Sequence, residues 1–166
     1  LDDPERGFGF RSTGPLDMRM HAGVGPSAAD LIATLDEREL ADIFWRYGEE
    51  KASRRIARAI VHDRTATPFT TTSALAELVA RIVRRHGGTH PATRVFQALR
   101  IAVNRELEHL EMFLEKVLEW LRPAGRLVII AYHSLEDRMV KQAMRSWLAH
   151  CTCPPTLPRC VCGAKA

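Results

Sequence analysis

His133 and Ser134 have side chains that can transfer protons or donate hydrogen bonds. They directly follow GRLVIIAY (residues 125–132), a run that would be apolar on both faces of a strand. Ligands of open α/β sheets collect at the carboxyl ends of strands, so this position favours a functional role, with His133 as a proton-transfer group. Ser134 and Asp137 also have the spacing of a helix capping box, which would explain both residues without a substrate. The pattern alone leaves both interpretations open.

A second candidate pair, Asp17 and Arg19, lies in the segment GPLDMRM (residues 14–20). Alternate side chains of an extended backbone share a face, so a carboxylate and a guanidinium at this spacing could contact one polar group together. The alternative is a local ion pair. The nearby glycines Gly23 and Gly25 resemble a nucleotide-binding turn, but no apolar strand precedes them, so we do not predict a cofactor loop there.

Four cysteines form two Cys-x-Cys pairs near the end of the chain, at Cys151, Cys153, Cys160 and Cys162. Four thiolates can hold zinc tetrahedrally, although zinc sites usually have at least two residues between paired cysteines. Zinc binding therefore stays an alternative to a compact turn with reduced thiols.

Arginines repeat on the polar sides of two predicted helices. The first row consists of Lys51, Arg54, Arg55 and Arg58, and the second of Arg81, Arg84 and Arg85. Arginine makes bidentate contacts to phosphate, and the formal net charge of +4 is compatible with a polyanionic partner. A solvated helix face is the more common explanation of such rows.

The elements that must position these residues are mostly helices. Residues 1–26 are rich in glycine and predicted to be turns, after which Ser27 caps a helix to Leu35. A capping box, Asp36 with Glu39, begins a helix that Gly48 ends. Apolar spacings of three and four predict further helices over 49–62, 75–83, 91–121 and 135–150.

Residues 127–132 give the strongest strand signal, and a strand that is apolar on both faces needs neighbouring strands. The fold class we predict is therefore α/β, mostly helical within this chain, with the earlier strands elsewhere in the same polypeptide. The first residue is Leu and not Met, which favours a fragment. No window approaches the length of a membrane helix and no signal peptide is visible, so we expect a cytoplasmic protein without a membrane partner.

Several long segments together resemble one family. LDDPERGFGF (1–10), GPLDMRM (14–20), HPATRVFQALRIAVNREL (90–107), GRLVIIAYHSLEDR (125–138) and CTCPPTLPRCVCG (151–163) are similar to the bacterial ribosomal RNA small-subunit methyltransferase H family, also called MraW. The resemblance spans essentially the whole chain.

The resemblance implies an S-adenosylmethionine-dependent enzyme that methylates the N4 amine of a cytidine in small-subunit (16S) ribosomal RNA. It implies a class I, Rossmann-like methyltransferase sheet with an inserted all-α substrate-recognition domain. Residues 1–17 would be a linker, 18–90 the helical insert, and 91–166 the C-terminal half of the methyltransferase domain.

By the same resemblance, Asp17, His133 and Ser134 would stand near the catalytic pocket. The cofactor-binding residues would lie upstream of Leu1, so this chain alone would be inactive. Ribosomal RNA or the ribosomal subunit would be the partner, and a homodimer is left open. The residues expected to contact RNA are Arg19, Arg54, Arg55, Arg58, Arg81, Arg84 and Arg85. The alternative function is a noncatalytic RNA-binding module with a zinc-stapled cysteine tail.

Overall fold

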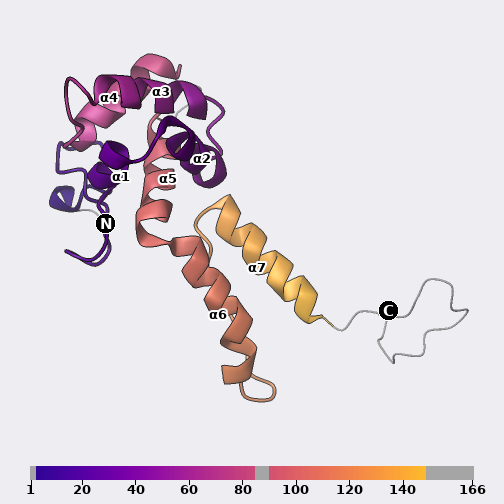
Figure 1. Ribbon diagram of the computed structural model, residues 1–166. Helices are drawn as coiled ribbons and strands as arrows, with labels where there is room; N and C mark the ends of the chain where they lie inside the picture. The colour runs from indigo at the N-terminus through magenta and orange to yellow at the C-terminus, as the bar shows by residue number, and fades with distance from the viewer. Residues whose placement is uncertain (1–2, 85–89, 149–166) are drawn as a thin grey trace, which may run out of the picture. The chain divides into compact units, whose positions relative to one another are not determined.

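The computed structural model describes residues 3–84 and 90–148, and these divide into two compact units, Leu1–Glu106 and Leu107–Ala166 (Figure 1). None of the helices in the described ranges has both the length and the apolarity that a bilayer span requires. The helices are η1 (Pro4–Arg6), α1 (Ala28–Thr34), α2 (Glu37–Gly48), α3 (Ser53–Asp63), α4 (Thr72–Ile82), α5 (Thr93–Asn104), α6 (Glu106–Trp120) and α7 (Ser134–Trp147).

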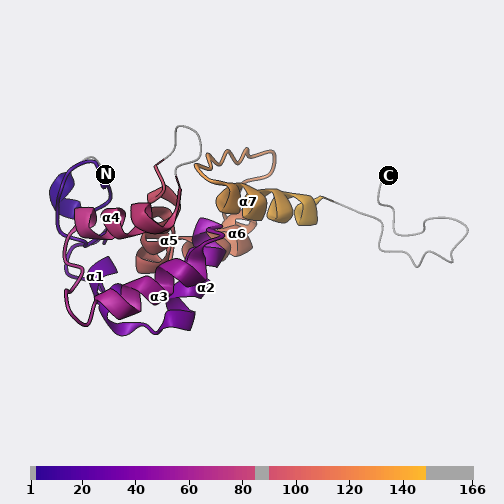
Figure 2. The ribbon, with the colours of Figure 1, turned by 90° about the horizontal axis from the view of Figure 1, so that it is seen from above.

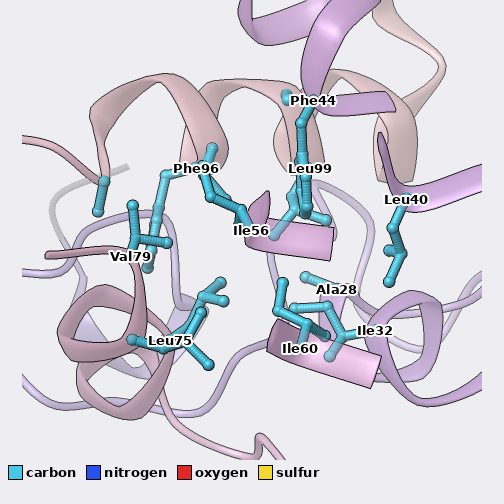
Figure 3. Packing of buried hydrophobic residues seen from close by; sticks show 14 of the residues in the cluster. Ala28, Ile32, Leu40, Phe44, Ile56, Ile60, Leu75, Val79, Phe96 and Leu99 are labelled. Carbon is cyan, nitrogen blue, oxygen red and sulfur yellow. The ribbon is translucent and has the colours of Figure 1, made fainter. Parts of the chain in front are cut away.

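The first unit has one hydrophobic core, to which α1 to α5 all contribute. α2 packs against α3 and α5, and α3 also contacts α4 (Figure 2). The apolar side chains of these helices point toward one another in the interior (Figure 3). The fully buried members include Phe44, Ile56, Leu75 and Leu99. Burying large side chains of this kind contributes about 1.5–3 kcal/mol each.

The two predicted starts of α1 and α2 are confirmed. The Ser27 hydroxyl accepts from the Asp30 amide and the Asp36 carboxylate accepts from the Glu39 amide, and both helices have complete capping boxes. α2 ends at Gly48, as predicted. A Cβ at Gly48 would lie 2.5 Å from the Arg94 carbonyl oxygen, so the missing side chain is what allows α2 and α5 to approach closely.

Two predicted helices differ most from the structure. The helix expected from 49 begins at Ser53, because Glu49 has a left-handed backbone (φ 49°) and the Glu50 carboxylate accepts a hydrogen bond from the Ala52 amide. The helix expected over 91–121 is two helices, α5 and α6, separated at Arg105, which has φ 49°. The apolar spacing continues through this break and therefore conceals it.

No sheet is present in the described part of the chain, where the β contact is an isolated antiparallel bridge between Pro15 and Thr71. Residues 127–132 are not assigned as a strand there, which corrects the local prediction. A strand exists only with a neighbouring strand to pair with, and no strand pairs with these residues among the described ranges. The mostly helical character of the chain is confirmed, and the larger sheet stays a prediction.

The second unit contains most of α6 and all of α7. α7 buries Leu135 and Val140. It begins at Ser134, one residue before the predicted start, and ends at Trp147 with Leu148 as its C-cap, so it is shorter than the predicted 135–150.

Candidate functional site

The segment that leads to Asp17 is anchored to the start of α4. The Thr72 side chain is fully buried, and its hydroxyl accepts from the Gly14 amide at 3.1 Å and donates to the Ser12 carbonyl at 3.1 Å. The Leu16 amide donates to the Thr70 carbonyl at 2.9 Å. These bonds fix the backbone immediately before the candidate carboxylate.

Asp17 and Arg19 form a bidentate ion pair. Arg19 Nε lies 2.8 Å from Asp17 Oδ1, and Nη2 lies 2.7 Å from Oδ2. The Arg19 amide also donates to Oδ1, and Nη1 donates to the Gly25 carbonyl. The ion-pair alternative is thus confirmed. The hydrogen bond from Arg19 lowers the pKa of the Asp17 carboxyl, so Asp17 is ionised at neutral pH.

The Asp17 carboxylate keeps capacity for a further donor. Its side chain is 30% exposed. Oδ2 accepts one hydrogen bond in the described structure, whereas a carboxylate oxygen has room for about two. Asp17 can therefore hold Arg19 and accept from a ligand amine at the same time.

The residue between them, Met18, is fully buried and has φ 62°, an unusual backbone conformation for a residue other than glycine. Asn104 stabilises it. Its Nδ2 donates to the Met18 carbonyl at 2.8 Å, and its Oδ1 accepts from the Met20 amide at 2.7 Å. Arg6 adds a bond to the Met20 carbonyl at 2.7 Å. Strained backbone that its surroundings hold in place is typical of functional segments.

Sequence reasoning did not assign a role to Asn104. Its position gives a weak signal, because asparagine is a poor helix former and here occupies the last residue of α5 among apolar neighbours. The three bonds that its amide makes, including one to the Arg100 carbonyl, explain why it is there.

His133, in the second unit, is the N-cap of α7. Its Nδ1 accepts from the Glu136 amide at 3.4 Å, while the Glu136 carboxylate accepts from the Tyr132 amide at 2.9 Å. The capping interaction predicted for Ser134 and Asp137 is therefore wrong by one residue: Ser134 is the first helical residue and is exposed. The imidazole has the geometry to replace a hydroxyl as the cap acceptor.

The second imidazole nitrogen of His133 is a buried donor. Because Nδ1 accepts a hydrogen bond, the neutral ring carries its proton on Nε2. Nε2 is 3.6 Å from a Glu136 carboxylate oxygen and has no hydrogen-bond partner in the described ranges, while the side chain is 9% exposed. Asp17 and His133 belong to different units, so each is a separate candidate here.

The first arginine row is exposed on α3, as predicted: Arg54, Arg55 and Arg58 face solvent while Ile56, Ala57 and Ile60 of the same helix are buried. Arg58 lies 3.4 Å from Glu37, and Arg81 of the second row lies 3.3 Å from Asp63. Arg84 is exposed. Arg85 and the four cysteines, Cys151, Cys153, Cys160 and Cys162, lie outside the described residues.

Together these features define a helical module with a cationic face, formed by Arg54, Arg55 and Arg58, and an anchored, ionised carboxylate, Asp17. A family model described as the MraW methylase family matches residues 1–166, and the chain belongs to this family.

Three relatives illustrate the similarity, each named ribosomal RNA small subunit methyltransferase H. The chain is 57% identical to the protein of Desulforapulum autotrophicum over 166 residues, covering 97% of this chain and 53% of the relative. It is 65% identical to that of Beijerinckia indica over 143 residues, covering 86% and 40%. It is 55% identical to that of Thermomicrobium roseum over 166 residues, covering 99% and 51%. The chain therefore spans about half the length of these relatives.

Proposed function

We propose that this chain is part of an S-adenosylmethionine-dependent enzyme that methylates the N4 amine of a cytidine in small-subunit ribosomal RNA. The family match over residues 1–166 carries the proposal. The names of the similar proteins support small-subunit ribosomal RNA, or the subunit itself, as the substrate. A cytoplasmic location belongs to the same proposal.

The reaction needs a positioned hydrogen-bond acceptor. The lone pair of the cytosine amine is delocalised into the ring, so the enzyme must orient this nitrogen toward the methyl group, and positioning supplies much of the catalysis. Asp17 suits the role of acceptor, because it is ionised, partly exposed and immobilised by Arg19. From the family resemblance, His133 and Ser134 are proposed as further residues near the catalytic pocket.

S-adenosylmethionine, when bound, supplies the methyl group, and we assign no residue of this chain to it. Gly23 and Gly25 have positive φ values, but no strand precedes them in the described residues and Pro26 follows. This is not the strand–glycine turn–helix arrangement of nucleotide sites.

The helical unit would bind the RNA around the target. An enzyme that modifies a base must take the base out of its stack and hold the flanking phosphates. The exposed Arg54, Arg55 and Arg58 are the proposed phosphate contacts. Arg81, Arg84 and Arg85 are proposed as a second set, and Arg19 as a contact close to the target. The helical domain of residues 18–90 is proposed as this recognition domain.

The test uses a polypeptide of the relatives' length that carries this sequence. Incubated with methyl-labelled S-adenosylmethionine and small ribosomal subunits, it should produce N4-methylcytidine, identified by mass spectrometry of digested RNA. Asp17→Asn should lower turnover by about 10²-fold or more, because the amide cannot replace the charged acceptor. Label on a carbon or a ribose oxygen, or no transfer at all, would contradict the proposal.

Calorimetric titration of the same polypeptide with S-adenosylhomocysteine, the product of methyl transfer, distinguishes the enzyme from the noncatalytic RNA-binding module. RNA binding without any affinity for this product would favour the noncatalytic module over the enzyme.

A further inference from the structure

An exposed tryptophan lies in an open groove between α2 and α3. Trp45 is 58% exposed, although its neighbour Phe44 is fully buried in the core. The groove that Trp45 lines has a volume of about 360 Å³. Pockets that hold small ligands have volumes of about 300–1,000 Å³, so the groove can take a group the size of a nucleobase. Trp45 therefore presents its indole to the groove and not to the core.

The charges around the groove favour an anionic ligand. Three of its four ionisable lining side chains are cationic, Lys51, Arg54 and Arg55, and the fourth is Asp42. Arg58 and Arg81 have carboxylate partners nearby, but in residues 3–84 and 90–148 no ion pair engages Lys51, Arg54 or Arg55. These three cations are therefore available for phosphates.

The start of α3 adds to this potential. Its N-cap, Ala52, provides no side-chain hydrogen bond, and Ser53, Arg54 and Arg55 begin the helix at the groove. The amides of the first helical turn place partial positive charge at this end of the helix, which the Glu50 carboxylate, bonded to the Ala52 amide, offsets in part. This contribution is secondary to the indole and the three cations.

We propose that this groove binds one unstacked base of single-stranded RNA against Trp45, with the phosphates on either side contacting Lys51, Arg54 and Arg55. Recognition of single strands combines an aromatic surface for the base with cations that follow the backbone. The bound nucleotide is a neighbour of the target and is not the methylated cytidine. The inference rests on the proposed function, because that function supplies the RNA.

Fluorescence of Trp45 tests the stacking directly in the full 166-residue chain. Trp120→Phe and Trp147→Phe leave Trp45 as the sole tryptophan. A short single-stranded RNA should quench its emission, and duplex RNA of the same sequence should quench it much less, because stacked bases cannot reach the indole. This measurement needs no change at Trp45.

Affinity measurements supply the matched comparison. Trp45→Ala should weaken binding of the single strand by about 5- to 150-fold, the range for loss of one base–aromatic stack, with an unchanged salt slope. Trp45→Tyr should restore most of the affinity. Trp120→Ala removes another exposed tryptophan, 64% exposed on α6, and should bind as the parent does. Circular dichroism verifies that each variant is folded.

Four outcomes would overturn the inference: no quenching on RNA binding, equal quenching by duplex and single strand, Trp45→Ala binding as tightly as Trp120→Ala, or quenching by an acidic peptide that matches the RNA. The first three leave the methylation proposal intact if N4-methylcytidine still forms. Conversely, Trp45-dependent RNA binding by a polypeptide of the relatives' length that transfers no methyl group would retain the groove and reject the proposed reaction.

Discussion

Asn104, which lies outside the Asp17–Arg19 pair, holds the backbone of the candidate site at two points. Its side-chain amide makes hydrogen bonds to the backbone on both sides of Arg19, at Met18 and Met20. Asn104→Ala removes the side-chain partner of the Met18 carbonyl and the Met20 amide, and we expect a loss of about 1–3 kcal/mol in the free energy of unfolding, measured by urea denaturation. Hydrogen exchange at the Met20 amide should accelerate as well. Asn104→Asp, which keeps the acceptor and loses the donor, should fall between. A change below about 0.3 kcal/mol would show that the Asn104 hydrogen bonds to Met18 and Met20 do not stabilise the fold.

Asp17 gives the site a definite pH dependence. Its pKa is lowered in the folded state by the Arg19 hydrogen bond, so its stabilising contribution is present above the unfolded pKa of about 3.9 and is lost as pH falls through the lower, folded value. The stability difference between the parent and Asp17→Asn should be constant above about pH 5 and should shrink below about pH 4. Urea midpoints from pH 2.5 to 7 measure it. A difference that stays constant across this range would mean that the ion pair is not stabilising.

Part of this site could be predicted from sequence. The spacing of Asp17 and Arg19 indicates that they can interact, because the pair is local. Asn104 is 86 residues from Met18, and no pattern in either segment encodes that contact. The sequence could not predict that the N-cap of α7 is His133 and not Ser134. Both side chains can accept a hydrogen bond from an amide, and the backbone angles decide which residue is the cap.

At the scale of elements, the crossing of α2 and α5 depends on Gly48. Alanine is up to about 1 kcal/mol better than glycine within a helix, but the new Cβ would lie 2.5 Å from the Arg94 oxygen and 3.2 Å from Ala98 Cβ. Overpacking of this kind costs about 1–3 kcal/mol, so Gly48→Ala should destabilise the chain in thermal or urea unfolding. Gly9→Ala is the control, because no atom lies within 4 Å of its added Cβ. Equal stability of the two variants would mean that the helices separate at little cost.

Most elements could be predicted because their caps and apolar spacings are local signals, as for α2. The boundary between α5 and α6 at Arg105 could not be predicted. Leu99 and Val103 before it and Leu107 and Leu110 after it keep one helical rhythm, while the break is a single residue's rotation into positive φ. Periodicity reports which faces are apolar and does not report such a rotation.

At the scale of the whole molecule, charge reversal tests the cationic face. If Arg54, Arg55 and Arg58 contact phosphates, their change to Glu should weaken RNA binding and reduce the slope of log K against log salt by about 2, at roughly 0.7 per lost contact with a single strand. Reversal of Lys116, Lys141 and Arg145 in the second unit changes the net charge equally and is the control. Equal salt slopes for the two triple variants would reject a localised RNA surface.

The larger α/β architecture was inferred from residues 127–132 and from the family resemblance. Family membership is established over the chain, whereas the sheet requires strands that the described residues do not include. A predicted helix can be verified within this chain because a helix forms its backbone hydrogen bonds internally. A predicted strand forms only when another segment supplies the partner hydrogen bonds.

The apolar run before α7 has a practical consequence for handling the 166-residue chain in solution. Val128, Ile130 and Tyr132 are 82%, 74% and 87% exposed, and their backbone groups have no strand partner in the described ranges. An unpaired apolar edge of this kind templates pairing between copies. Concentrated samples should therefore self-associate, seen as a rising sedimentation coefficient, and Val128→Lys with Ile130→Lys should suppress it. In cells the same exposure would make this run an attractive substrate for chaperones until it is covered.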